Sequence, residues 1–195
     1  TAMKHTLNVL TLTALAAAAS AQTAPASGLN YNTVSISRAS NKQSLAVQGL
    51  LGSSNILLGY QSNNGDIFGG QGNFAPQRAL NTLTAGYVFR GVTQGIDATV
   101  LVQQSQGEHT GYGLTLRRAL NEVYAGLEIS ASYIGTLTSG YTSEFAVGGI
   151  TGTGTSATAF ELAYNYNKTI SLAVGLAKGN EDAKRSTVFS VRAAF

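Results

Sequence analysis

The sequence contains no cysteine and no tryptophan, and only two prolines and one methionine among its 195 residues. Without cysteine the chain forms no disulfide scaffold, binds no metal or iron–sulfur cluster through thiolates and has no thiol nucleophile. Charged residues make up only 11% of the chain, less than half of the ~25% usual in soluble domains. No run of 18 apolar residues occurs beyond the N-terminal stretch, which argues against membrane-spanning helices.

Glycine and apolar residues are abundant by contrast. The chain has 23 glycines, and 44% of its residues are apolar. That apolar fraction is too high for a disordered chain, which cannot bury a core. A glycine-rich chain with few charges therefore indicates β structure.

The N-terminal residues have the three parts of a secretory signal peptide. Lys4 supplies the positive charge, residues 7–18 are apolar, and Ala19-Ser20-Ala21 forms a small-x-small cleavage site. We expect a signal peptide over residues 1–21, in which Thr1 and Ala2 are non-native residues ahead of the start at Met3. The alternative is a buried N-terminal helix.

Period-two alternation of apolar and small polar residues recurs along the rest of the chain, as in strands whose side chains point to opposite faces. Neither proline falls inside an alternating stretch. We therefore predict a short periplasmic segment over residues 22–28 and a β-barrel over residues 29–195. The ten predicted strands are 34–37, 44–51, 56–61, 82–89, 96–103, 112–117, 123–133, 160–167, 170–177 and 188–195.

Short and long connections alternate between these strands, which is typical of an outer-membrane barrel. Aromatic residues end the apolar faces, as expected for the two lipid–water interfaces. A soluble sandwich would instead bury its aromatic residues in mid-strand. If the first strand runs outward, one aromatic girdle contains Tyr60, Tyr112, Tyr133, Phe160 and Phe189, and the other contains Tyr87, Phe89, Tyr164, Tyr166 and Phe195.

The last strand carries Phe189, Val191 and Ala193 and ends at Phe195. In this pattern the sequence resembles small bacterial outer-membrane barrels of the OmpA-transmembrane-domain and opacity-protein class. The resemblance implies that the barrel-assembly machinery reads this strand as its signal, and that the outer membrane is the location. It favours a closed, antiparallel, up-and-down barrel. Ten strands are predicted, eight being the alternative because it is commonest in that class, and Glu144–Ile150 could extend the flanking strands into a hairpin above the membrane.

Catalytic and cofactor chemistry find little support. Beyond the leader the chain has one histidine, His109, beside Glu108 and near Ser105 on a short loop. A hydrolytic site needs a nucleophile and a base held in a rigid arrangement, and one histidine with a scattered carboxylate makes no tetrahedral metal site. We therefore expect no enzyme activity, metal or cofactor. The net charge of +3 reflects few charges rather than a basic patch, so nucleic-acid binding is not expected.

Five charged residues fall on the polar face of the strands and should point into the lumen. They are Asp97, Arg117, Glu128, Glu161 and Arg192. Charges inside a barrel pair with one another or stay hydrated, so we expect a salt-bridge network across the lumen. That network either has only a structural role or acts as a gate that opens when Arg117 or Arg192 changes partners.

Two functions are consistent with these patterns. The first is a structural or envelope-organising barrel in outer-membrane lipid, with weak, gated conduction of small solutes or ions. The alternative is a surface-interaction barrel that binds an envelope or surface partner through the loops at residues 62–79 and 135–157.

Overall fold

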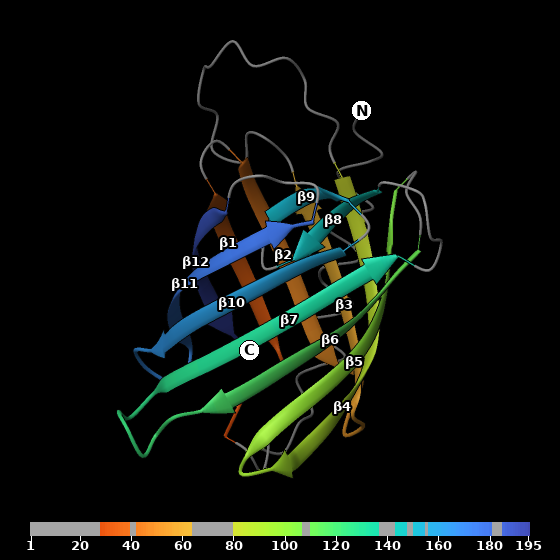
Figure 1. The fold of residues 1–195 in the computed structure, drawn as a ribbon. Helices are drawn as coiled ribbons and strands as arrows, with labels where there is room; N and C mark the ends of the chain where they lie inside the picture. The colour runs from red at the N-terminus through yellow and green to blue at the C-terminus, as the bar shows by residue number, and fades with distance from the viewer. Residues whose placement is uncertain are drawn as a thin grey trace.

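The computed structural model describes residues 28–39, 42–63, 80–106, 110–136, 143–147, 150–154, 156–180 and 185–195. Ten antiparallel strands form a closed barrel (Figure 1). Within the described residues no helix is both long and apolar enough to cross a membrane. The barrel strands are β1 (Thr33–Ala39), β2 (Lys42–Leu50), β3 (Ile56–Asn63), β4 (Leu80–Thr93), β5 (Ile96–Ser105), β6 (Thr110–Ala119), β7 (Leu127–Thr136), β10 (Ser156–Asn165), β11 (Ile170–Gly179) and β12 (Ser186–Ala194).

Each barrel strand pairs with its neighbours in sequence, and β1 pairs with β12 to close the barrel. This confirms the predicted ten-stranded, up-and-down barrel, and the eight-stranded alternative is wrong. A hairpin is present near Glu144–Ile150, but it forms a sheet of its own and does not extend the flanking strands as predicted. Strands β8 (Ser143–Val147) and β9 (Ile150–Gly154) pair only with each other, and they lie beside β7, β10 and β11.

The short turns between strands lie at one end of the barrel, and so do Gly28 and Phe195. We call this end the turn end and the opposite end the loop end. At the turn between β4 and β5, Gln94 and Gly95 both have positive φ, as a two-residue hairpin turn requires. The register between these strands shifts between Phe89 and Thr93. This irregularity brings the Gly91 backbone N–H to 2.8 Å from the Asp97 carboxylate.

One predicted strand began too early. The prediction started it at Val123, but β7 begins at Leu127, and residues 120–126 form a turn. There the Val123 and Tyr124 backbone N–H groups both donate to the Leu120 carbonyl. Val123 is 70% exposed. Alternation continues through this turn by chance, so the period alone could not locate the start of the strand.

The outer wall of the barrel is apolar. The paired residues Val100 and Leu114 illustrate it: they are 51% and 41% exposed on neighbouring strands. Most predicted girdle residues are exposed on this wall, and Tyr87 packs against Phe89 with ring centroids 4.9 Å apart. Phe160 and Phe189 lie in mid-strand rather than at a strand end, because β10 and β12 each continue beyond them toward the loop end.

Residues 1–21, the predicted signal peptide, and residues 22–27 lie outside the described residues.

Candidate functional site: a charged constriction in the lumen

The structure places all five predicted lumen charges on the inner face of the barrel. Asp97 comes from β5, Arg117 from β6, Glu128 from β7, Glu161 from β10 and Arg192 from β12. Register explains their proximity. Asp97 lies opposite Arg117 on the paired strands, and Ser130 of β7 lies opposite both Arg117 and Glu161.

Four of the five side chains form one continuous network, which we call the lumen network: Arg117, Glu128, Arg192 and Glu161. Arg117 donates from Nε to the Glu128 carboxylate at 2.8 Å. Arg192 pairs with Glu161, and its Nη1 atom lies 3.9 Å from the same Glu128 oxygen. Glu128 is only 3% exposed and Arg117 9%. Each arginine is thus neutralised by a carboxylate, as burial of these charges requires.

Asp97 lies beside the lumen network, opposite Arg117 on the paired strand. Its carboxylate accepts hydrogen bonds from the Tyr31 hydroxyl at 2.9 Å and from the Gly91 backbone N–H. Asp97 is fully buried, so both donors compensate for its lost hydration. Tyr31 lies ahead of β1, and its neutral phenol donates the hydrogen bond to Asp97.

Sequence reasoning missed Tyr31. Its ring lies 4.5 Å from the guanidinium carbon of Arg117 and 5.9 Å from that of Arg90, distances at which an aromatic face attracts a cation. Arg90 also donates to Asn55 at 3.1 Å. The sequence did contain one signal that a side chain packs inside the lumen. Leu57 and Val88 are apolar residues on the otherwise polar inner faces of their strands. Both pack in a cluster with Tyr31.

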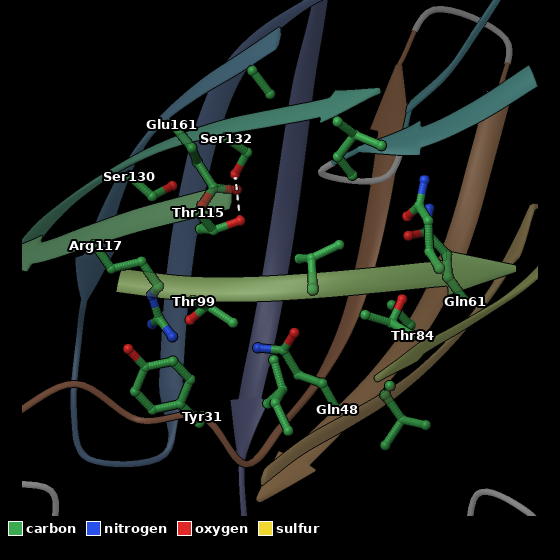
Figure 2. A pocket seen from close by; sticks show the side chains of 18 of the residues that line it. Tyr31, Gln48, Gln61, Thr84, Thr99, Thr115, Arg117, Ser130, Ser132 and Glu161 are labelled. Carbon is green, nitrogen blue, oxygen red and sulfur yellow. Dashed lines mark hydrogen bonds between the residues drawn. The ribbon is translucent and has the colours of Figure 1, made fainter. Parts of the chain in front are cut away.

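Two cavities lie on either side of the lumen network. The inner cavity, about 210 Å³, extends toward the loop end between hydroxyl and amide side chains such as Thr84, Ser132 and Gln61 (Figure 2). The turn-side cavity, about 760 Å³, is lined by the turn at residues 165–168 and by the chain end at Phe195. Arg117 and Arg192 line both cavities. The network therefore lies between the two chambers.

Figure 2 shows the side chains that line the inner cavity at this level. Arg117 extends toward the ring of Tyr31, while Glu161 and the hydrogen-bonded pair Thr115 and Ser132 lie above it. The Thr115 and Ser132 hydroxyls are 3.0 Å apart. The inner cavity is therefore charged and aromatic at this end, whereas its walls carry uncharged hydroxyl, amide and apolar side chains.

The described residues contain no cluster of three or more histidine, cysteine or carboxylate side chains able to hold a metal ion. Glu108 and His109 lie outside the described residues. Ser105 is 3% exposed and shares a 2.8 Å hydrogen bond with Thr82 across the inner wall. This hydrogen bond gives Ser105 a structural role in the inner wall. The absence of enzyme activity stays a prediction.

No family model matches the sequence, and no curated protein matches it. Among solved structures, the chain is similar to the KdgM porin at 11% identity, with 84% of this chain and 98% of the porin aligned and a TM-score of 0.47. A structure of the KdgM porin in complex with disordered oligogalacturonate matches at 12% identity, with the same coverage and a TM-score of 0.45. A triple mutant of the Rh. blastica porin matches at 11% identity over 80% of this chain and 56% of that chain, with a TM-score of 0.28. Oligogalacturonate binding is a property of the KdgM porin.

Proposed function

We propose that this chain is a small outer-membrane β-barrel that passes small solutes or ions through a narrow lumen, and that the lumen network is its gate. The observation that carries the proposal is that Arg117 and Arg192 line both cavities. A solute that crosses from one chamber to the other must pass these two side chains. Two arginines facing Glu128 and Glu161 leave no excess of one sign, so this level obstructs rather than selects ions by charge.

Membrane placement is supported by the outer wall. Apolar side chains cover it, and most residues of the two proposed girdles, all but Tyr60 and Tyr164, are exposed, a distribution that suits lipid flanked by two interfaces. Insertion would depend on the final strand, where Phe189, Val191 and Phe195 are all exposed on the outer wall. We also propose that the chain is a barrel of the OmpA-transmembrane-domain and opacity-protein class, on the basis of the residue pattern in that strand.

Partner exchange by Arg192 provides a route to opening. Arg192 contacts Glu161 and lies 3.9 Å from Glu128, so two carboxylates are within its reach. A small movement of this side chain would exchange Glu161 for Glu128, and the Glu161 carboxylate that it leaves lines the inner cavity, where water can hydrate it. Glu128 is held at the same time by Arg117 and remains a fixed acceptor.

Single-channel conductance in a planar bilayer tests this function. The refolded chain should conduct weakly, whereas Arg117→Ala and Arg192→Ala should each raise the conductance because each removes a side chain from the constriction. Arg118→Ala is the matched control. Arg118 is adjacent in sequence but lies outside the lumen, in an exposed pair with Glu122. Variants that are all folded, by heat-shifted gel mobility, yet silent would refute the proposal.

The surface-interaction role is a second candidate. The observation that favours it is the β8–β9 hairpin, which gives the connection between β7 and β10 a structure of its own at the loop end. An envelope or surface partner would then bind through the loops at residues 62–79 and 135–157. Replacing residues 137–155 by a short turn separates the two functions. Conductance should persist, while adhesion of cells that display the protein should disappear if the loops carry the function.

A further inference from the structure

The segment that precedes β1 lies inside the barrel. Leu29 is 1% exposed and Tyr31 is 2% exposed. Both pack against Leu50, Leu57 and Val88 of the inner wall. Burial of these side chains provides the favourable free energy that holds residues 29–32 in the lumen. We call residues 29–32 the plug segment.

Polar contacts fix the plug segment at both of its ends. The Asn32 side-chain oxygen accepts a hydrogen bond from the Leu50 backbone N–H at 3.0 Å. The Asn32 backbone carbonyl accepts one from the Phe195 backbone N–H at 3.1 Å. The Asn30 carbonyl accepts from Arg117 at 3.1 Å. Together with the bond from Tyr31 to Asp97, these contacts join the segment to four different places on the barrel.

Arg117 is the point at which the plug segment meets the lumen network. Its guanidinium is shared among the Glu128 carboxylate, the Asn30 carbonyl and the face of the Tyr31 ring. Two of these three partners belong to the plug segment. Tyr31 also lines the inner cavity, so withdrawal of the segment would both remove part of the cavity floor and release Arg117 from two contacts.

We infer that the plug segment is a built-in closing element of the lumen and that Tyr31 is the positioning residue that keeps Arg117 in its closed arrangement. The inference rests on the proposed function and deepens it, because it names what regulates the same constriction. Opening then has two steps. In the first, the Tyr31–Asp97 hydrogen bond breaks and the plug segment leaves the lumen. In the second, Arg117 is free to change partners.

Conductance of three tyrosine variants tests the inference. Tyr31→Ala removes both the ring and the hydroxyl and should raise conductance several-fold. Tyr31→Phe keeps the ring over Arg117 and loses the hydroxyl with its bond to Asp97, so its conductance should lie between those of the wild type and Tyr31→Ala. Tyr87→Ala is the control, since Tyr87 lies on the outer wall. Tyr31→Leu, which keeps an apolar side chain in the buried cluster but lacks both the aromatic face and the hydroxyl, substitutes for Tyr31→Ala if that variant does not fold.

Thiol labelling reads the position of the plug segment without relying on conduction. The chain has no cysteine, so Leu29→Cys introduces a single, buried thiol. Adding Tyr31→Ala should speed its reaction with a membrane-impermeant maleimide by about tenfold or more, because a hydrogen bond to a charged group is lost.

The two readouts distinguish the possible failures. Raised conductance in Arg117→Ala with wild-type conductance in Tyr31→Ala would overturn the inference and leave the proposed function standing. If every variant is silent, the proposed function fails, and the labelling rate alone decides whether Tyr31 holds the plug segment. An unchanged rate would overturn that as well.

Discussion

The outer wall and the lumen of this barrel are made of alternate residues of the same strands, yet they depend on different kinds of interaction. On the outer wall, side chains such as Val100 and Leu114 are 51% and 41% exposed and have no specific partner to satisfy. In the lumen, Asp97 and Glu128 are almost fully buried and each accepts hydrogen bonds from particular donors. The outer wall therefore needs only hydrophobicity, whereas the lumen needs particular pairs.

This contrast determines how substitutions should rank. A change on the outer wall should matter in proportion to the cost of transferring the new group to lipid. A change in the lumen should matter according to which partner it leaves unpaired. Four substitutions test this ranking, from the largest expected effect to the smallest.

Glu128→Ala should be the most destabilising. It removes the carboxylate that Arg117 contacts and that lies 3.9 Å from Arg192, and leaving a buried charge without its partner costs about 3–5 kcal/mol. Equilibrium unfolding in urea from lipid vesicles measures the loss. A loss below about 1 kcal/mol, the range of exposed pairs, would mean that water in the lumen compensates the arginines and that the pairs are not essential.

Val100→Arg should destabilise the barrel by about 2–4 kcal/mol, the cost of an arginine on the lipid face near the middle of the membrane. Val100 lies in the middle of β5 and is half-exposed on the outer wall. Val100→Leu is the control and should leave the unfolding free energy nearly unchanged in the same vesicle assay. If the arginine is tolerated as well as leucine, this wall does not face lipid.

Gly113→Ala should cost about 1–3 kcal/mol through overpacking. A Cβ at this inward position would lie 2.7 Å from the Tyr133 carbonyl oxygen and 2.9 Å from an Ile134 side-chain carbon. Gly59→Ala is the matched control, because a Cβ there meets its nearest atoms at 3.5 Å or more. The prediction fails if the two variants unfold at the same urea concentration.

Arg118→Ala should have the smallest effect, about 1 kcal/mol or less, because Arg118 pairs with Glu122 at the exposed surface, where ion pairs contribute little. Added salt should reduce even this difference. A loss as large as that of Glu128→Ala in the same unfolding experiment would show that burial does not separate the two classes of ion pair.

The outer wall and the number of strands could be predicted from the sequence because alternation is a local signal. Each strand carries its own pattern, as in β5, where Val100 and Val102 face outward and Thr99 and Gln103 face inward. The same locality explains the error at Val123, where a turn repeats the pattern without pairing. Inward placement of the five charges followed from the same period.

Partner choice within the lumen could not be predicted, because it depends on register and closure. Nothing local indicates that Glu128 lies between Arg117 and Arg192, which come from strands far apart in the chain. The plug segment is the extreme case, since Tyr31 and Asp97 are 66 residues apart in sequence. Its position depends on an interior volume that exists only after the barrel has closed.

Cysteine accessibility from each side of the membrane tests most directly whether the lumen network closes the lumen. In a chain without native cysteine, Ser132→Cys places a thiol in the inner cavity and Ser171→Cys places one in the turn-side cavity. In oriented vesicles, an impermeant maleimide should reach Ser132→Cys only from the loop end and Ser171→Cys only from the turn end. With Arg117→Ala and Arg192→Ala added, both thiols should react from both sides. If either thiol already reacts equally from both sides when the two arginines are present, the lumen network does not close the lumen.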